Sequence, residues 1–263
     1  MKSFFVFSLF HLLLFQILFS QPFFPYELIK YKVKFSFITA GWAEIELKRF
    51  DDEKDIYHIR LDTQSSGLVS SIFNVEDHAE SWIDKNICSL KYIKNQREGK
   101  WVADEEVSFD YKSRKIFFEI KKKKERGEIE TKREEIEMGE NECFQDMIST
   151  LYYFRTLKIE EGKIYQIPTF DRGRIFKTEL HILGRERIST ELGEFNAYLL
   201  QPISKFEGAF RTRKGKMWVW ISADENKIPL KIKAKFTFGF VYMEITYYQR
   251  GETILTPQKT GFP

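Results

Sequence analysis

Residues that perform most protein chemistry are scarce in this sequence. Its 263 residues include 2 cysteines and 4 histidines. It contains no G-x-S-x-G, H-E-x-x-H, C-x-x-C or phosphate-binding glycine loop. These absences leave a hydrolase, a metalloprotease, a redox enzyme and a nucleotide-binding protein without positive support. We therefore expect a non-enzymatic protein that needs no cofactor and no metal.

A charge excess of one sign is also lacking. The 42 basic and 39 acidic residues leave a formal net charge of +3. Because bases and acids alternate locally, they form no basic face that would predict DNA or RNA binding. Hydrophobic residues make up 43% of the chain and aromatic residues 16%, which suits a substantial core built from β-sheet.

One hydrophobic run stands out, from Phe4 to Phe19, after Lys2 and before Ser20. This pattern is typical of a secretory signal peptide, residues 1–20, cut after Ser20. The run is shorter than the roughly 20 residues that a spanning helix needs, so we expect no transmembrane span in the mature chain. An uncleaved membrane anchor is the alternative. Either way, the chain is expected to be exported.

The two cysteines, Cys88 and Cys143, both follow this N-terminal segment. In an oxidising compartment they can form a disulfide that ties a strand end to the start of a helix. Two separate buried thiols are the alternative, because the deciding Cα separation cannot be obtained from the sequence.

Alternation of apolar and polar residues dominates the rest of the chain. Val33 and Phe35 alternate with lysines, and so do the apolar residues of 230–238. Ala40 and Gly41 are expected to turn the chain between the first two strands. The pattern predicts about fourteen strands joined by short turns. We expect a mainly β fold, a large curled antiparallel sheet or open barrel of the meander type.

This sheet is expected to form a single domain over residues 21–252, followed by a loose tail, 253–263. One segment, about 143–158, instead has the period of an amphipathic helix. We expect this helix to pack on the concave face of the sheet and to line a ligand cavity. The candidate cavity residues are Phe144, Met147, Ile148, Leu151, Tyr152, Trp218 and Trp220.

Charged residues on this helix are interpreted as structural. Asn141 is the expected N-cap, and Asp146 is expected to accept backbone N–H bonds at the helix start. Arg155 falls on the apolar face, where it can cap carbonyls or pair with a carboxylate from the sheet. Asp146 and Arg155 project from opposite sides of the helix, so they cannot pair with each other and are not taken as a catalytic pair.

The two tryptophans among the cavity candidates, Trp218 and Trp220, share one face of a strand whose other face is also apolar. One face is expected to pack in the core, and the other to meet a ligand, the helix or another layer.

Two polar motifs allow two interpretations each. The ribbon 112–137 has a basic tip, 121–127, that is interpreted as a solvated turn protecting a sheet edge; contact with anionic lipid headgroups or an acidic partner is the alternative. Glu76, His78 and Glu80 would share one strand face with a spacing that can hold a metal. Without a second ligand cluster, a solvated polar face is the preferred interpretation.

Five short segments, in order, resemble a bacterial exported family called domain of unknown function 3108. They are Ile38–Glu44, Asp146–Arg155, Gly193–Phe195, Trp220–Asp224 and Ile228–Leu230. The resemblance spans roughly residues 26 to 248, and the ribbon 112–137 is more elaborate than the family pattern. It implies a β-rich protein of the periplasm or outer envelope, similar to the open-barrel lipoprotein carriers LolA and LolB. It implies no activity.

The favoured hypothesis is a non-enzymatic envelope protein that binds a lipid or the acyl chain of a lipoprotein between sheet and helix. The alternative is an envelope scaffold or assembly factor that binds a protein partner through sheet edges or the ribbon 112–137. A third hypothesis, an outer-membrane barrel, conflicts with the helix and the charged ribbons.

Overall fold

The computed structural model describes residues 26–124, 126–139, 143–203, 216–236 and 239–257. The predicted signal peptide 1–20, the expected N-cap Asn141 and residues 258–263 of the predicted tail lie outside these ranges. Within the described residues, no helix combines the length and the apolar character needed to cross a bilayer.

The described chain forms one antiparallel sheet of 15 strands and two short helices. The helices are α1 (Gly67–Ile72) and α2 (Ser149–Thr156). The strands are β1 (Tyr26–Phe35), β2 (Ile38–Asp51), β3 (Ile56–Ser65), β4 (Glu76–Ile83), β5 (Ser89–Glu98), β6 (Trp101–Asp110), β7 (Lys115–Lys123), β8 (Ile129–Glu137), β9 (Ile164–Asp171), β10 (Arg174–Thr190), β11 (Gly193–Ile203), β12 (Met217–Ser222), β13 (Pro229–Phe236), β14 (Gly239–Arg250) and β15 (Thr253–Leu255). The predicted mainly β meander is thereby confirmed.

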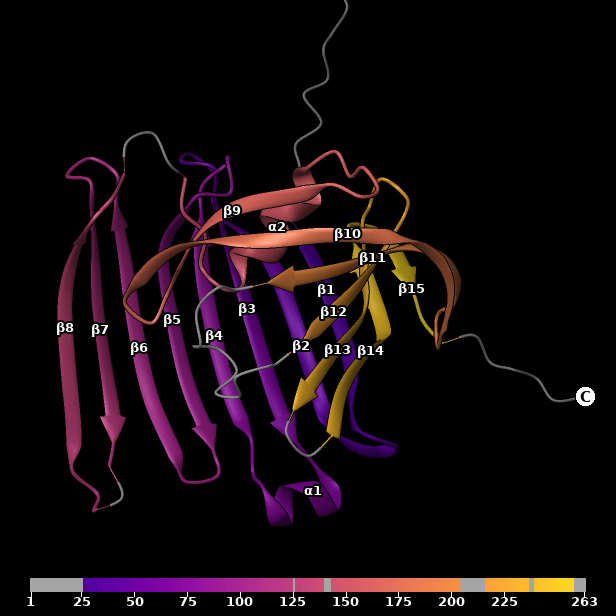
Figure 1. Ribbon diagram of the computed structural model, residues 1–263, viewed down its shortest axis with the longest axis horizontal. Coiled ribbons are helices and arrows are strands. Elements are labelled where there is room, and N and C mark those ends of the chain that lie inside the picture. Colours follow the sequence, from indigo (N-terminus) through magenta and orange to yellow (C-terminus); the bar gives the residue numbers. More distant parts are fainter. Residues whose placement is uncertain (1–25, 125, 140–142, 204–215, 237–238, 258–263) are drawn as a thin grey trace, which may run out of the picture.

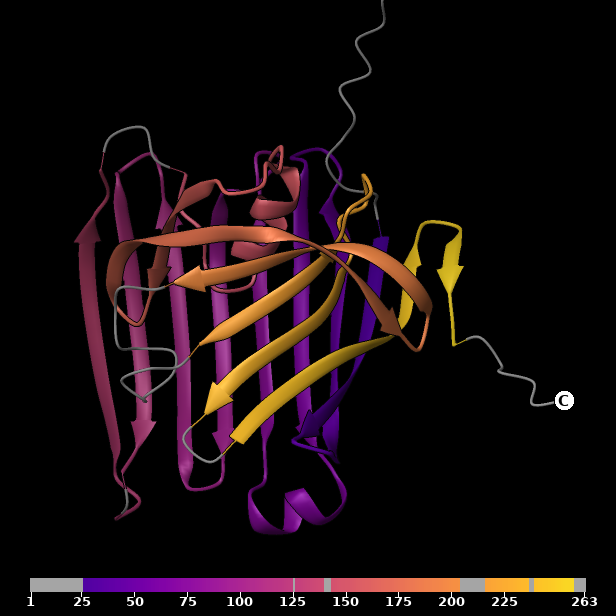
Figure 2. The same ribbon diagram turned by 45° about the vertical axis from the view of Figure 1, so that its right-hand side comes forward.

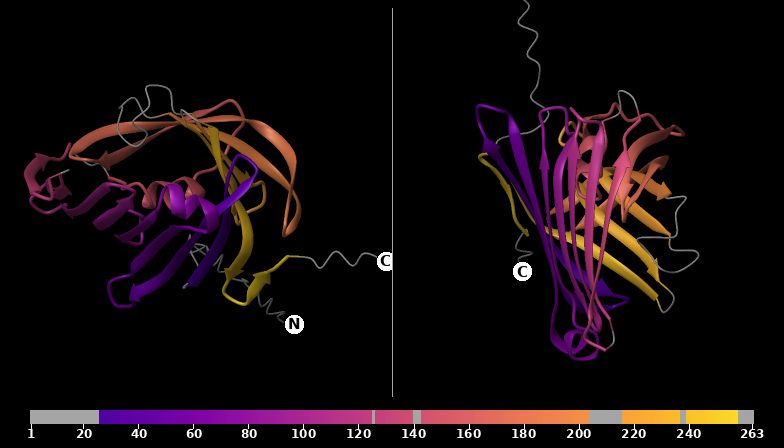
Figure 3. Two further views of the ribbon diagram at one scale, coloured as in Figure 1. Left: turned by 90° about the horizontal axis from the view of Figure 1, so that it is seen from below. Right: turned by 90° about the vertical axis from the view of Figure 1, so that its left-hand side faces the viewer.

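The order of strands explains the shape of the molecule. The path runs from β8 back to β1, then from β14 back to β9, so that β1 pairs with β14 at its centre. The strands β1–β8 form a broad layer, and β9–β14 fold back across it (Figures 1 and 2). Seen from below, α2 lies between these two layers (Figure 3, left). The sheet is not closed, because the path ends at β8 and β9.

The core fills the space around α2. Ile29 and Tyr31, alternate residues of β1, are at most 1% exposed, as are Leu47 of β2 and Ile59 of β3. This is the two-residue period expected of strands with one covered face. The helix adds Tyr152 to this apolar cluster and Phe154 to a second one, formed with residues of β9–β12.

The turn expected at Ala40 and Gly41 is wrong. β1 ends at Phe35 and β2 begins at Ile38, so the chain turns at Ser36 and Phe37. Gly41 lies inside β2 instead, where a Cβ atom would sit 2.0 Å from the backbone oxygen of Gln64. The glycine is needed because two strands approach closely, not because the chain reverses.

Two expected boundaries also shift. The helix begins at Ser149 rather than near residue 143, and Gln145 instead forms a parallel bridge with Thr169 of β9. The tail does not become loose at Thr253, because β15 pairs with Tyr248–Arg250 of β14. At the helix start a strand further along the chain determines the conformation, and at the tail a hairpin with the preceding strand does.

Candidate functional site

Asp146 fixes the start of α2 to the sheet. Its Oδ1 accepts backbone N–H bonds from Ile148 and Ser149 at 2.8 and 2.9 Å. Its Oδ2 accepts hydrogen bonds from the hydroxyl groups of Ser81 on β4 and Ser89 on β5, at 2.5 and 2.7 Å. Burial raises the pKa of Asp146, and these hydrogen bonds counteract that rise. The aspartate therefore caps the helix, as expected, and also attaches it to two strands; the two serines were not identified from the sequence.

Arg155 fixes the other end of α2. Its guanidinium donates two hydrogen bonds to Glu27 of β1, at 2.7 and 2.6 Å, and a third to the backbone oxygen of Asn226. Both side chains of the pair are at most 4% exposed. Burial alone would raise the pKa of Glu27, but the charge and hydrogen bonds of Arg155, with smaller contributions from Arg250 and Tyr248, together outweigh burial and lower it. The carboxylate that Arg155 required thus comes from the first strand, 128 positions away.

A disulfide between Cys88 and Cys143 holds the segment that leads into α2. The two Cα atoms lie 5.0 Å apart, within the ordinary range for a bridge. Next to it, the Ser89 N–H donates to the Phe144 carbonyl at 2.9 Å. Between the disulfide and Arg155, the helix is held at both ends.

The seven predicted cavity residues do not surround one cavity. Phe144, Ile148 and Tyr152 are core residues, at most 5% exposed, and Leu151 packs against that core. Met147 is 39% exposed. Because these side chains are either packed or turned outward, the helix supplies a plug and not a ligand surface.

Trp218 and Trp220 lie on the outer face of β12. The lysine ammonium groups of β13 approach their rings, Lys231 at 6.0 Å from Trp220 and Lys233 at 5.5 Å from Trp218. The Trp220 indole also donates a hydrogen bond to Glu186 of β10. Val219 and Ile221, on the other face of β12, belong to the core. The prediction that one face packs in the core holds for Val219 and Ile221. The tryptophans on the other face contact lysines and Glu186, and Trp220 is also partly buried against the main core cluster.

Below α2 the inner face of the sheet is apolar but only partly covered. Val33 and Phe35 continue the row of Glu27 and Tyr31 along β1, so they point to the same side as the Arg155 pair. Both are partly exposed, whereas Tyr31 is 1% exposed. The inner face therefore changes from core to accessible surface within one strand.

This accessible surface continues across four strands. Cross-strand pairs join Phe35 to Val241, Val33 to Met243 and Met243 to Ile232. Met217 of β12 is linked to them through Ala234. We call this surface the apolar floor, and it consists of Val33, Phe35, Met217, Ile232, Val241 and Met243, each partly exposed. Six apolar side chains with no charged member form a surface that suits a hydrocarbon group.

Two buried carboxylates lie on another part of the inner face. Burial, and then the proximity of Asp171, raise the pKa of Glu105 of β6 to about 7. Asp171 ends β9, and the turn that follows brings Gly173 against Phe118 of β7, which its Cβ would meet at 3.2 Å. The β9–β10 turn therefore contacts the opposite layer where these two acids meet.

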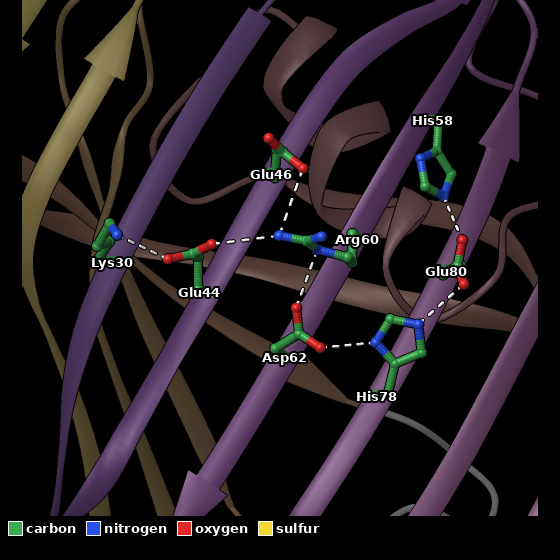
Figure 4. A network of polar contacts seen from close by, with 8 residues as sticks. All are labelled: Lys30, Glu44, Glu46, His58, Arg60, Asp62, His78 and Glu80. Carbon is green, nitrogen blue, oxygen red and sulfur yellow. Dashed lines mark hydrogen bonds and ion pairs between the residues drawn. The ribbon is translucent and has the colours of Figure 1, made fainter.

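A polar network covers the outer face of β1–β4 (Figure 4). His78 bonds Asp62 at 2.6 Å and Glu80 at 2.9 Å, and Glu80 also bonds His58 at 2.6 Å. Burial opposes protonation of His78, but the two carboxylates outweigh it and raise its pKa. Glu76, the third residue of the predicted set, is exposed and not part of the drawn network. Among the described residues, no group of three or more His, Cys, Asp or Glu side chains is arranged so that it could hold a metal ion.

A depression of about 650 Å³ lies near the β10–β11 hairpin and the turn after β12. Its walls include Arg185, Arg187, Glu194 and Asp224, so it is polar and carries both charges. It is lined by none of the apolar floor residues, which makes it a separate feature.

The sequence matches the family model described as "Protein of unknown function (DUF3108)" over residues 30–246, which confirms the resemblance. Its fold is similar to the crystal structure of a β-barrel-like protein of domain of unknown function DUF1849 from Brucella abortus. That similarity has a TM-score of 0.56 and 8% sequence identity, and it covers 88% of this chain and 99% of that chain. At this identity the likeness concerns the fold alone. No curated protein matches the sequence.

Proposed function

The chain belongs to the DUF3108 family, and from that premise we propose that it is a non-enzymatic envelope protein that binds an acyl chain on the apolar floor. The observation that carries the proposal is the change along β1, from buried Ile29 and Tyr31 to partly exposed Val33 and Phe35. An accessible apolar surface inside a curled sheet is a site that an apolar ligand can cover.

The composition of the floor favours a flexible hydrocarbon. Each methylene that leaves water contributes about 0.8 kcal/mol, so several methylenes are enough for a stable complex. Met217 and Met243 provide unbranched, adaptable side chains that suit acyl chains of varying shape. The ligand class is therefore a lipid or the acyl chain of a lipid-modified protein.

We propose a non-enzymatic role because the apolar floor has no titratable side chain. A catalytic site needs titratable groups that face the substrate, and the six side chains of the floor are all apolar. The buried charged groups near α2, Asp146 and the Glu27–Arg155 pair, already bond one another or the sheet. Their contacts support a role in holding the helix.

Export to the periplasm or outer envelope is part of the proposal. It is supported by the signal-like segment 1–20 and by the Cys88–Cys143 disulfide, a bond that persists in oxidising compartments.

Binding can be tested with a fluorescent fatty acid whose emission rises in apolar surroundings. Met243→Lys puts a charge on the floor, and Tyr242→Lys puts the same charge on the opposite face of β14 at a similarly exposed position. We expect the purified mature protein to bind the probe, and Met243→Lys to weaken binding at least about tenfold, or 1.4 kcal/mol. Tyr242→Lys should bind like the wild type.

Thermal unfolding of both variants shows whether the fold is retained. A wild type that neither binds the probe nor carries lipid on purification contradicts the proposal. Equal weakening by both lysines would place the ligand elsewhere.

A second candidate function uses the free edge of β8. This strand ends the sheet path, and its residues are mostly exposed. Such an edge can accept a strand from a protein partner. The many charged side chains of Ile129–Glu137 oppose edge pairing, so acyl binding is the favoured function.

A further inference from the structure

Every second connection of an antiparallel meander lies at the same end of its sheet. In β1–β8 these connections are the β1–β2 turn at Ser36 and Phe37, helix α1, the β5–β6 turn at Gly99 and Lys100, and the β7–β8 turn. Figure 1 shows all four at the bottom of the molecule. We call this region the lower end.

The lower end carries the most exposed apolar side chains of the described residues. Phe37 in the β1–β2 turn is 100% exposed, Ile72 and Leu68 of α1 are 87% and 79% exposed, and Ile129 at the start of β8 is 70% exposed. Ile38 and Phe73, beside them in sequence, are also more than half exposed. Elsewhere in the described chain the highest value is 61%, at Phe50. Large apolar side chains concentrated at one end indicate an interaction surface.

Helix α1 illustrates the point, because none of its six residues is buried. Leu68 and Ile72 are four positions apart, so they lie on the same side of the helix. A helix in a globular protein ordinarily turns such a pair toward the core. Here the pair faces away from it.

Basic residues accompany the apolar ones. The segment 121–128 contains five basic residues and two acidic ones, and Lys121, Lys123 and Lys124 are exposed. Lys100 in the neighbouring turn is exposed as well. Lys121 forms an ion pair with Glu119 at 2.8 Å, and Lys124 has a longer contact of 3.8 Å with Glu130. An anionic membrane surface offers acyl chains to apolar side chains and negatively charged headgroups to lysines, so apolar tips flanked by lysines suit it.

We propose that the lower end docks on the surface of an anionic lipid bilayer. The apolar side chains enter the boundary between headgroups and acyl chains, and the lysines contact lipid phosphates. The β1–β2 and β7–β8 turns are about 30 Å apart at about 4.8 Å per strand, so the apolar tips form a broad row that suits a flat surface. Docking does not depend on the apolar floor, although Phe35 of the floor is two residues from Phe37.

Flotation of the purified mature protein with vesicles tests this directly. We expect it to float with phosphatidylcholine vesicles that contain phosphatidylglycerol, and to float less with pure phosphatidylcholine or in high salt. The double variant Leu68→Ser/Ile72→Ser should lose at least nine-tenths of the floated fraction. Lys123→Glu/Lys124→Glu should reduce flotation with the anionic vesicles and leave the weaker neutral binding unchanged.

Phe50→Ser, at the opposite end of β2, is the matched control and should float like the wild type. The proposal is overturned if the wild type does not float, or if Phe50→Ser reduces flotation as much as the α1 variant. It is also overturned if the α1 variant instead converts a dimer to a monomer, which would assign the lower end to a second copy of the chain. Fatty-acid binding measured on the same α1 variant should be unchanged, so that failure of acyl binding and failure of docking remain distinguishable.

Discussion

One face of β1 contains two contrasting regions. Its first half, with Glu27, Ile29 and Tyr31, lies under α2 and is at most 3% exposed. Its second half, with Val33 and Phe35, has the same alternation and the same orientation but remains partly exposed. The two halves differ in exposure because α2 covers only the first half, and not because their side chains differ in character. Whether this apolar row becomes core or accessible surface is therefore decided by where the helix ends.

A few polar contacts determine where α2 lies over the sheet. Asp146 attaches one end of α2 to β4 and β5, and Arg155 attaches the other end to β1. The helix has only eight residues, too few to be stable alone in water. Its tertiary contacts keep it over the first half of the interior, so that among the described residues the floor remains partly exposed.

The most disruptive way to test this comparison is to remove the charge that attaches the helix to β1. Arg155→Met leaves Glu27 buried without its partner and should lower the free energy of unfolding by about 3–5 kcal/mol. Arg60→Met is the control, because Arg60 makes three ion pairs on the outer face but is 38% exposed (Figure 4). It should cost under about 1 kcal/mol. Chemical unfolding measures both, and equal losses would show that the buried pair does not hold the helix.

The second test uses pH and the other contact between the layers. Because the pKa of Glu105 is raised to about 7 from its usual 4.5, the folded state binds this proton more tightly than the unfolded state. The free energy of unfolding should therefore fall by up to about 3 kcal/mol as pH rises from 4.5 to 7, and this contribution should change little above that. Glu105→Gln should abolish that fall and be the more stable protein at pH 8.

The control for this titration is Glu106→Gln, on the opposite face of β6 and 57% exposed. Its stability should follow the pH profile of the wild type. If the wild type and Glu105→Gln have parallel profiles in chemical unfolding from pH 5 to pH 8, Glu105 does not destabilise the contact between β6 and the β9–β10 turn.

The smallest effect is expected on the floor, and it is the sharpest test of the comparison. Val33→Ala should lower the free energy of unfolding by less than about 1 kcal/mol, because its side chain is already partly in water. Ile29→Ala, four residues earlier on the same face, should cost about 2–5 kcal/mol because it leaves a cavity in the core. Similar losses at the two positions would mean that the floor is ordinary core.

Local pattern was sufficient to predict much of the fold. The alternation of Leu230 and Ile232 with lysines identified β13, and the apolar period of 143–158 identified a helix, although the helix begins later than expected, at Ser149. The resemblance to the family was also recognisable from short segments. These features depend on residues a few positions apart, which is the range over which a sequence shows its periods directly.

Features that depend on distant partners could not be predicted. The need of Arg155 for a carboxylate was evident, but Glu27 is identified only once β1 is known to lie beside α2. Gly41 was assigned to a turn, since its close neighbour Gln64 belongs to the next strand. The apolar floor was missed for the same reason, because β1, β12, β13 and β14 form one surface only after pairing.

The pairing of β1 with β14 also has a consequence for the order of folding. Val33 and Met243 are neighbours in the sheet, so the contact between them cannot form until nearly the whole chain has been synthesised. Until then β1 is paired with β2 along one edge only, and its other edge, at the later centre of the whole sheet, has no partner strand. Contacts of such long sequence separation slow folding and prolong the exposure of a strand edge to aggregation. We therefore expect the middle of the sheet to be completed late in folding, so that the unpaired edge of β1 is exposed to aggregation for a long time.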